Sequence, residues 1–516
     1  MPVSPTYPGV YIEEIPSGVR TIIGVGTSTT AFIGKARKGP VNQPEVIHNF
    51  GDYDREFGGL SQDSTMSFAV HQYFLNGGTE AVIARVTRGA TPTAATTTFT
   101  LPGPGGDLIV EASSPGEWGD NLVLEVDDDT ATSELFNLVV DDPGPADGGT
   151  GTGDKETLRN LSVDPASPRF VTRVLEQQSR FVRVQGSVPS QRPNAGNPSA
   201  TTNGNDGGDI QAGDVAPAAG KSSKGGIYAL EDADIFNLLC LPPFTFSSDI
   251  DAATFAAAAS YCLERRAMLL IDPPAGALDP ATAATEFATI AGAISAGSPP
   301  ARNAAFFFPR LRVANPLKNN LVEEFVPCGA VAGVFARTDS TRGVWKAPAG
   351  LEAGLVGTQE LTYKLSDAEN GDLNPLGINC LRTFALVGSV IWGARTVQGA
   401  DRLASEWKYV PVRRLALFLE ETLYRNTQWV VFEPNDEPLW AQIRLNIGAF
   451  MQDLFRQGAF QGRTPREAYF VKCDKETTTQ NDINRGIVNI VVGFAPLKPA
   501  EFVIIKIQQI AGQIEV

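Results

Sequence analysis

"SEWKYVPVRRLALFLEETLYRNTQW" occupies residues 405–429, and "EPLWAQIRLNIGAFMQDLFRQGAF" follows it at 437–460. Both segments repeat large apolar residues every three or four positions, as on one face of an α-helix. The residues that form these stripes are Leu415, Leu419 and Leu423 in the first segment, and Trp440, Ile443, Ile447, Phe450 and Leu454 in the second. The sequence therefore predicts two long amphipathic helices. Strand-prone runs at 467–474, 486–496 and 501–507 complete an α+β domain.

The chain before these helices alternates between two patterns. Residues 21–90 and 227–400 combine short apolar strands with amphipathic helices, which is typical of an α/β core. Residues 91–186 carry strand signals separated by turn residues and predict an inserted β-rich domain. Residues 187–226 are rich in Pro, Gly, Ser, Asn and Thr, and their large aliphatic residues are limited to Val188, Ile210 and Val215. This composition predicts a flexible linker or surface loop.

The charge of the chain is unevenly distributed. The 516 residues have a formal net charge of −16, which argues against nucleic acid as the main partner. The first 400 residues hold 28 basic and 44 acidic residues, whereas the rest hold 14 of each. We expect the acidic part to face water and the neutral part to be covered.

Targeting and cysteine signals are weak. No apolar run reaches the ~18 residues of a membrane helix, and the N-terminus lacks a basic patch followed by an apolar stretch. We expect neither membrane insertion nor secretion by a signal peptide. The cysteines are five in number and widely spaced, with no C-x-x-C pair, which indicates folding in a reduced compartment and no metal or redox work.

Three glycine-rich motifs resemble ligand loops but lack required residues. "AGKSS" at 219–223 has Val215 where a phosphate loop needs its first glycine. "GVGTST" at 24–29 lacks the third glycine of a dinucleotide loop, so a tight turn is the simpler interpretation. "NGNDGGD" at 203–209 has Gly207 where a calcium loop needs an oxygen ligand, which leaves at most a loose ion site.

The titratable residues do not form a recognisable catalytic set. The two histidines are His48 and His71, and His71 falls on the apolar face of a predicted helix. Neither lies in a context typical of a Ser-His-Asp triad. Asp127, Asp128 and Asp129 form a charge run, which usually marks a solvated face. We therefore expect no catalytic, cofactor-binding or metal site, and no enzyme activity.

Both ends of the chain contain isolated strand-prone segments. In "PTYPGVYIEEIPSGVR", residues 5–20, prolines and glycines enclose Val10, Tyr11 and Ile12 and prevent a local hairpin. At the other end, the corresponding residues are Val503, Ile505 and Ile507. An unpaired strand exposes N–H and C=O groups that need partners. A 12-residue arm spans about 40 Å, far enough to add a strand to the sheet of a neighbouring subunit.

The free energy gained by burying one arm is of the same order as the entropy cost of ordering it. Burial of each large side chain contributes about 1.5–3 kcal/mol, whereas ordering each residue costs about 1–2 kcal/mol. A single arm is therefore marginal, and arms at both ends of many copies act cooperatively. Because donor arm and acceptor edge are different surfaces, the contact is head-to-tail and gives rings or helical filaments. The alternative is that both ends fold back onto their own domain.

Several longer segments resemble contractile tail sheath proteins, the family found in phage tails and contractile injection systems. The resemblance covers nearly the whole chain apart from 187–226. It is carried by "YPGVYIEEIPSG" at 7–18, "SPGEWGDNLVLEV" at 114–126, "LRNLSVDPASPRFV" at 158–171, "WKYVPVRRLALFLEETLYRNTQWVVFEPNDEPLW" at 407–440, "FRQGAFQGRTPREAYFVKCD" at 455–474 and "VGFAPLKPAEFVIIKI" at 492–507.

The resemblance implies a fold and a domain plan. The α/β core, residues 21–90 plus 227–400, would be subtilisin-like in shape but non-catalytic. The insertion at 91–186 would be a sandwich-like outer domain, and residues 401–498 an inner α+β domain that touches a tube. Residues 1–20 and 499–516 would be the terminal arms.

The resemblance also implies function and partners. Such a chain is a structural subunit that stacks as hexameric rings around an inner tube and contracts to drive the tube through a target envelope. The implied partners are other copies of the chain, the inner tube protein, and baseplate and terminal cap proteins. Assembly would take place in a bacterial cytoplasm, and the finished particle is a phage tail or an injection system, which the sequence does not distinguish.

Two sets of residues are candidates for specific roles in such a machine. Contraction needs hinges at the arm roots, for which the candidates are Pro16, Gly18, Pro496 and Pro499; the alternative is that they only punctuate strands. Basic residues on the C-terminal helices are candidates for contact with an acidic tube, namely Arg413, Arg414, Arg444 and Arg456. Their alternative role is in solvated or intradomain ion pairs.

Two rival functions remain. A static self-assembling tube or shell protein would share the arms but would not contract. An α/β hydrolytic enzyme is disfavoured because a catalytic set is missing.

Overall fold

The computed structural model describes residues 20–89, 94–130, 132–144, 153–295 and 297–506. The chain divides into two compact units. The larger unit comprises Gly26–Arg413, and the smaller unit combines the residues up to Val25 with those from Arg414 onward. The boundaries at 25/26 and 413/414 differ from the expected domain limits near residues 20 and 400.

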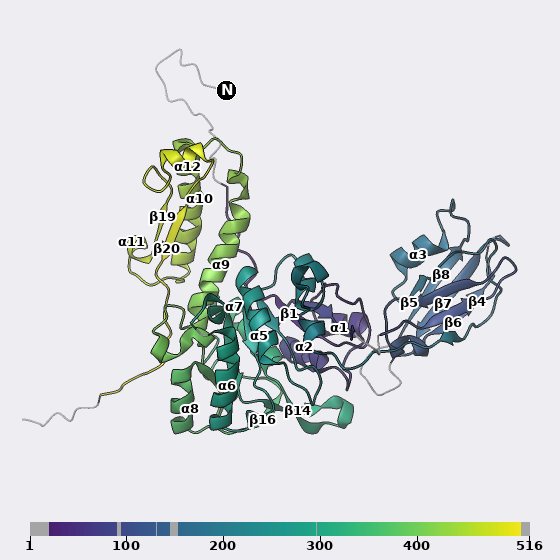
Figure 1. Ribbon diagram of the computed structural model, residues 1–516, viewed down its shortest axis with the longest axis horizontal. Helices are drawn as coiled ribbons and strands as arrows, with labels where there is room; N and C mark the ends of the chain where they lie inside the picture. Colours follow the sequence, from purple (N-terminus) through teal and green to yellow (C-terminus); the bar gives the residue numbers. More distant parts are fainter. Residues whose placement is uncertain (1–19, 90–93, 131, 145–152, 296, 507–516) are drawn as a thin grey trace, which may run out of the picture. The chain divides into compact units, whose positions relative to one another are not determined.

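An eight-stranded sheet forms the centre of the larger unit (Figure 1). The six inner strands are parallel, and an antiparallel strand closes each edge. The strand order is β18 (Gly388–Ile391), β17 (Ile378–Phe384), β13 (Ala304–Phe308), β12 (Met268–Ile271), β11 (Leu238–Cys240), β1 (Thr30–Gly34), β3 (Ala81–Arg85) and β2 (Glu45–Ile47).

Both faces of this sheet are covered by helices, so its inner strands are mostly apolar, with polar exceptions such as Thr30 in β1, Arg85 in β3 and Asn379 in β17. In β13, Phe306 and Phe308 belong to the core on one face, with α5 (Ala252–Glu264) and α6 (Pro280–Ile294). Phe307 belongs to the core on the other face. The helices on that second face are α1 (Phe50–Phe57), α2 (Thr65–Leu75) and α7 (Cys328–Arg342). This architecture confirms a mixed α/β fold.

The remainder of this α/β body is small. A three-stranded antiparallel sheet has the order β15 (Leu321–Phe325), β14 (Leu311–Asn315) and β16 (Thr358–Leu361). The short helical elements are α4 (Ala212–Val215), η2 (Gly220–Ser223), η3 (Gly226–Asp232), η4 (Pro299–Asn303), η5 (Pro316–Lys318), α8 (Asp367–Leu373), η6 (Asn374–Leu376), η7 (Val397–Gly399) and η8 (Asp401–Leu403).

The inserted part of the larger unit consists of two antiparallel sheets around one core. The core includes Phe99 and Val110 from one sheet and Leu124 and Phe136 from the other. The first sheet has the order β10 (Ala200–Thr202), β4 (Thr98–Leu101), β5 (Leu108–Ala112) and β9 (Val182–Val184). The second has the order β6 (Val123–Asp127), β7 (Phe136–Asp142) and β8 (Asp154–Leu161), and the insertion also contains α3 (Val171–Gln178) and η1 (Glu117–Asn121).

The segment at 187–226, expected to be a flexible linker or surface loop, is anchored to the two domains that it joins. Its first part belongs to the inserted domain, because β10 pairs with β4 and Val188 packs against the core there. Its second part belongs to the α/β body, where Ile210 and Val215 are buried. Three aliphatic side chains and a short strand are therefore enough to fix a segment whose composition resembles a loop.

The smaller unit confirms the two predicted helices. They are α9 (Val410–Asn426), which begins in the last residues of the larger unit, and α10 (Glu437–Arg456), and they lie side by side in Figure 1. The unit also contains η9 (Gln428–Val430), α11 (Pro465–Ala468), β19 (Tyr469–Lys472), α12 (Gln480–Asn484) and β20 (Val491–Phe494). The expected strand at 501–507 does not form in its described part, residues 501–506.

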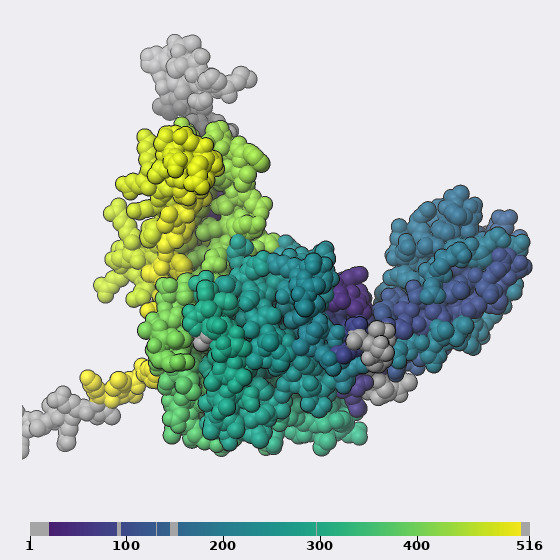
Figure 2. Space-filling view, viewed as in Figure 1, coloured from purple at the N-terminus to yellow at the C-terminus, as the bar shows by residue number. Residues whose placement is uncertain are grey.

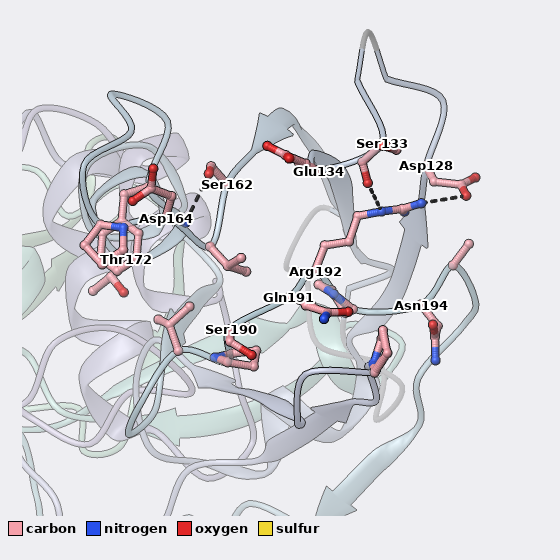
Figure 3. A pocket seen from close by; sticks show the side chains of 18 of the residues that line it. Asp128, Ser133, Glu134, Ser162, Asp164, Thr172, Ser190, Gln191, Arg192 and Asn194 are labelled. Carbon is pink, nitrogen blue, oxygen red and sulfur yellow. Dashed lines mark hydrogen bonds and ion pairs between the residues drawn. The ribbon is translucent and has the colours of Figure 1, made fainter.

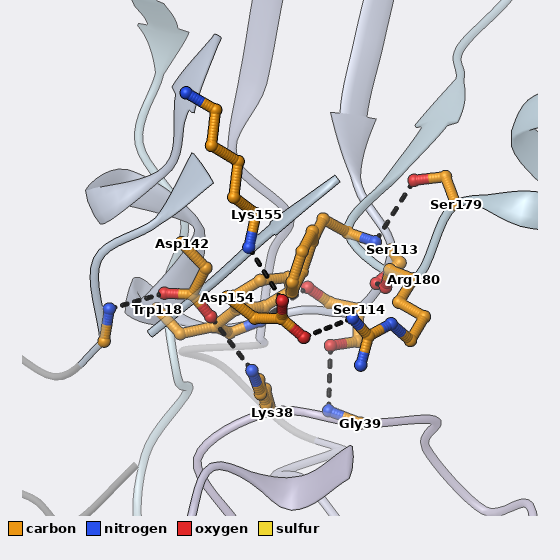
Figure 4. Close-up of polar contacts among 12 residues, drawn as sticks. Lys38, Gly39, Ser113, Ser114, Trp118, Asp142, Asp154, Lys155, Ser179 and Arg180 are labelled. Carbon is orange, nitrogen blue, oxygen red and sulfur yellow. Dashed lines mark hydrogen bonds and ion pairs between the residues drawn. The ribbon is translucent and has the colours of Figure 1, made fainter. Parts of the chain in front are cut away.

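A buried ion pair joins the inserted domain to the α/β body (Figure 4). The Lys38 Nζ lies 2.9 Å from Asp142 Oδ2, and the two side chains are 11% and 8% exposed. The Lys38 ammonium also lies 5.6 Å from the ring centroid of Trp118. Beside it, the Gly39 N–H donates to Ser114 Oγ at 3.0 Å. The joint is therefore polar, specific and largely closed to water.

Arg85 reinforces the same joint from the end of β3. Its side chain is 1% exposed, and its guanidinium donates to carbonyl oxygens of Ala36, Arg37 and Gly39. It also donates to the Pro115 oxygen of the inserted domain at 2.8 Å. One buried cation thus holds loops from both domains.

We expect the Lys38–Asp142 pair to be strongly coupled. Lys38→Met or Asp142→Leu alone leaves one buried charge without its partner and should cost about 3–5 kcal/mol. The double variant removes both charges and should recover most of that loss. Thermal unfolding, with hydrogen exchange of the Gly39 amide as the local reporter, measures the coupling. Single variants that unfold like the wild type would contradict a buried pair.

Asp272 is an isolated buried carboxyl group at the end of β12. It accepts a hydrogen bond from the Cys328 N–H at 2.7 Å through Oδ1, and its Oδ2 has no partner among the described residues. Burial raises the pKa of Asp272 to about 7. The folded chain therefore holds this proton more tightly than the unfolded chain, in which an aspartate has a pKa of about 3.9.

Asp272 should make the stability of the larger unit depend on pH. Its contribution is fully present below about pH 4, declines as the pH rises towards 7, and is lost above that value. The decline amounts to about 4 kcal/mol. Asp272→Asn keeps the side chain neutral and should flatten the dependence of unfolding free energy on pH between about pH 4 and 7, whatever its effect on absolute stability. An unchanged slope would contradict the raised pKa.

Candidate functional site

The first described residues, 20–25, run along α9 and α10 in the smaller unit. Side chains of these helices form hydrogen bonds with the backbone of the segment. Asn426 accepts from the Ile23 N–H at 3.4 Å and donates to the Ile23 oxygen at 3.1 Å. Thr422 accepts from the Val25 N–H at 3.3 Å, and Asn446 accepts from the Arg20 N–H at 3.1 Å. The N-terminal segment therefore leaves from the smaller unit.

Sequence reasoning missed this segment. The prediction of a tight turn at 24–29 does not describe Gly24, which lies against α9: a Cβ there would come within 2.9 Å of the Phe418 ring. Arg20 places its guanidinium 4.6 Å from the ring centroid of Trp429. The available signal was the polar pair Thr422 and Asn426, one helical turn apart.

The sheet of the smaller unit is open. β19 and β20 pair antiparallel, with Tyr469 opposite Phe494 and Lys472 opposite Val491. Neither strand pairs with a third strand in the described part of the chain. Phe470 and Val491 are 50% and 43% exposed. Among the described residues, two outer rows of backbone N–H and C=O groups therefore remain available for added strands, although the sheet itself is supported by α10, where the Tyr469 hydroxyl donates to Gln452 at 2.9 Å.

The C-terminal segment beyond this sheet carries four consecutive exposed apolar residues. The chain is tied as far as Pro496, which forms a bridge with Phe460. The following residues, 497–506, contain no helix or strand, and Figure 2 shows their end as a thin yellow extension. The four exposed residues are Phe502, Val503, Ile504 and Ile505, at 75–82%. Such a run is unusual on an isolated protein surface.

The structure describes only some of the predicted arm and hinge residues. Val503 and Ile505 are exposed, as stated above, and Pro496 is the last residue bridged to the body, with Pro499 three residues further on. The remaining predicted arm and hinge residues lie outside the described residues; they are Val10, Tyr11, Ile12, Pro16, Gly18 and Ile507.

Two of the four arginines predicted to face a tube are buried instead. Arg413 is 1% exposed, donates to Asn303 Oδ1 at 3.0 Å and places its guanidinium 4.9 Å from the Trp407 ring centroid. Arg414 is 3% exposed. A guanidinium can be buried where it stacks on an aromatic ring and donates to an amide. Arg413 is therefore held by contacts within its own chain, and the burial of both side chains counts against the prediction that they face a tube.

The other two arginines lie nearer to solvent. Arg444 donates to the Cys473 carbonyl and pairs with Glu437 at 2.6 Å, and its side chain is 31% exposed. Arg456 lies 3.6 Å from Asp453, and its side chain is 72% exposed. Arg456 is therefore the best-exposed cation of the predicted set.

Residues of the motifs that resemble ligand-binding or catalytic sites form contacts within the protein. Lys221 pairs with Glu264 on the surface. Asp206, in the glycine-rich segment, accepts from the Glu117 N–H at 2.9 Å. His71 packs edge-on against Phe50, and burial lowers the pKa of its imidazole. In the described ranges, no group of His, Cys, Asp or Glu could hold a metal ion, and no helix is long and apolar enough to cross a membrane.

A groove of about 1110 Å³ lies on the inserted domain and has a mixed polar and apolar lining (Figure 3). Arg192 forms part of its lining: its Nε donates to the Ser133 oxygen at 2.7 Å, and its Nη2 contacts Asp128 at 3.2 Å. The residues that line the groove include no histidine or cysteine. These contacts attach the segment around Arg192 to the domain and form no recognisable catalytic set.

The C-terminal part of the chain matches a known family. Residues 404–510 match the sequence model of the phage tail sheath C-terminal domain. The tail sheath protein of Vibrio phage KVP40 is 28% identical over 188 residues, which are 36% of this chain. The matched segment spans only about a quarter, 27%, of that relative's length.

Solved structures are similar over nearly the whole chain. The sheath complex of the extracellular contractile injection system PVC, in its contracted state, superposes with a TM-score of 0.59 at 22% identity and covers 98% of both chains. The contracted helical sheath of the anti-feeding prophage gives 0.58 at 23% identity, over 98% of this chain and all of the other. The chain is therefore similar to contractile tail sheath proteins in sequence at its C-terminal end, and in fold along nearly its entire length.

Proposed function

We propose that this protein is the sheath subunit of a contractile phage tail or injection system. The observation that carries the proposal is the smaller unit, which combines an open two-stranded sheet with an extended apolar segment at 502–505. One copy thus offers a donor strand and an acceptor edge. Added to the likeness to sheath proteins, this favours a polymer joined by exchanged strands.

The arrangement of the smaller unit supports exchange between copies. The N-terminal segment at 20–25 and the C-terminal segment beyond Pro496 both belong to this unit. Arms from several copies would therefore meet around the same kind of sheet. Because the donor and acceptor surfaces differ, each contact is head-to-tail, which is compatible with stacked hexameric rings or a continuous helix.

Contraction requires bodies that move while their connections persist. The sheet of the larger unit has helices packed on both faces, and such close packing makes it a rigid body. In our proposal it rotates and slides between two packings, while the exchanged strands keep the copies linked through hinges near Pro496 and Pro499. We assign the hinge role at the other end to Pro16 and Gly18.

The proposed partners follow from the same scheme. The neutral C-terminal part, residues 401–516, would face an inner tube, with Arg456 and Arg444 as its contact cations. The acidic first 400 residues would face water. Baseplate and terminal cap proteins would close the ends of the particle. A static tube is the alternative, because strand exchange alone does not require contraction.

Electron microscopy of purified particles distinguishes contraction from a static tube. We expect two helical lattices of the same subunit, one long and narrow and one short and wide, with the short form appearing after a trigger such as mild denaturant. A single lattice under every condition would contradict contraction and favour the static tube.

Ile505→Asp tests the exchanged strand. Ile505 is 80% exposed in the single chain, so the substitution should leave folding and thermal unfolding of the subunit unchanged. In a particle the new carboxylate would be buried in a partner's sheet, so we expect at least a tenfold loss of long particles. Ile505→Val keeps an apolar strand former and serves as the matched control.

Sedimentation and particle counting measure both variants. Normal particle numbers with Ile505→Asp would contradict burial of this segment between copies. A similar loss with Ile505→Val would show that the effect does not arise from charge.

A further inference from the structure

A strained turn connects α9 to α10. The Glu433 N–H donates to the Val430 oxygen at 3.2 Å and closes a β-turn over Val431 and Phe432. Val431 has φ −66° and ψ 130°, and Phe432 has φ +71°. These angles define a type II turn, whose third position normally holds glycine because it requires positive φ. Phenylalanine at this position is a genuine conformational outlier.

The strained residue is also fully exposed. The Phe432 side chain has no shielding from the rest of the described chain, and the neighbouring Val431 is 63% exposed. The isolated subunit therefore carries both backbone strain and unprotected aromatic surface at the same residue. Neither cost is offset by a contact of Phe432 within the described part of the subunit, which points to a contact made in the assembly.

The larger unit offers an apolar hollow of suitable size. A cavity of about 320 Å³ lies along α6, lined by small residues that let a ring approach closely. The lining comprises Ala284, Phe287, Ala288, Ala291, Gly292, Leu376, Val397, Ala400 and Arg402.

The other cavities described for this chain fit a phenyl ring less well. The groove at Arg192, at about 1110 Å³, is far larger than a phenyl ring, and the hollow near Lys35 and Asp63 is lined by charged side chains. The pocket beside Phe246 holds only about 30 Å³.

We propose that Phe432 of one copy inserts into the α6 cavity of a second copy. The exposed ring and the hollow are different surfaces of the chain, so a head-to-tail contact between them can repeat along a polymer. The inference rests on the proposed function only in requiring that copies associate, and it does not depend on exchanged arms or on contraction.

Phe432→Gly tests the proposal because it separates stability from assembly. Glycine relieves the positive φ, so the monomer should melt at a higher temperature than the wild type. The same variant lacks the ring, so we expect the concentration needed for particle formation to rise at least tenfold. Phe432→Asn, which also tolerates positive φ, should behave in the same way.

The matched control is Leu386→Gly. Leu386 is equally exposed, at 99%, but its φ is not positive. Glycine there should not raise the melting temperature. A lower melting temperature for Phe432→Gly, or normal particle formation by it, would overturn the proposal. Normal self-association with loss of binding to purified tube protein would assign the ring to the tube and overturn it equally.

Disulfide cross-linking tests the cavity. All five native cysteines are buried, so Phe432→Cys combined with the exposed Ala288→Cys adds the reactive pair. Oxidised particles should yield a ladder of linked chains, and each single variant should yield none. Particles that yield no ladder, or disulfides formed only within one chain, would contradict the contact between Phe432 and the α6 cavity and would leave the proposed function intact. A wild-type chain that never associates would contradict the proposed function together with it.

Discussion

Backbone N–H and C=O groups that have no strand partner among the described residues, at the outer edges of β19 and β20, are the constraint on which our account of this protein depends. Two antiparallel strands leave as many of these groups open as they pair, and such open edges can accept a further strand. The same unit holds residues 502–505 away from any core, with their apolar side chains in solvent. Each feature is unfavourable in a single chain, and each is relieved when one copy supplies a strand to the next.

The two units of the chain follow opposite design rules. In the larger unit, the sheet is covered on both faces, a short antiparallel strand lies at each edge, and charged groups such as Lys38 and Arg85 are buried with partners. In the smaller unit, strand edges, apolar side chains and the strained Phe432 are left uncovered. In the proposed machine, the larger unit moves as a rigid body, and the smaller unit, with its open strand edges, links the copies so that they move without separating.

Elements whose apolar residues recur with a regular period could be predicted from the sequence. Helices α9 and α10 could be predicted because their apolar stripes bury one face of each helix. The α/β core could be predicted because most positions of its inner strands are apolar. Contacts that depend on tertiary neighbours were not readable. Arg413 looked like a surface cation, since nothing local announces that Trp407 and Asn303 will enclose it. The segment at 187–226 looked like a linker, because composition does not show that Ile210 reaches a core. Phe432 gave no sequence signal, since its strain arises from a turn geometry that the flanking residues impose.

The central claim is that copies of this chain are joined by shared backbone ladders. A density map of the assembled particle that traces the main chain tests it most directly. The account predicts that residues 499–506 of one copy run beside β19 or β20 of another and exchange N–H···O=C hydrogen bonds with it. A map in which these residues pair only within their own copy, with both sheet edges still open, would contradict it.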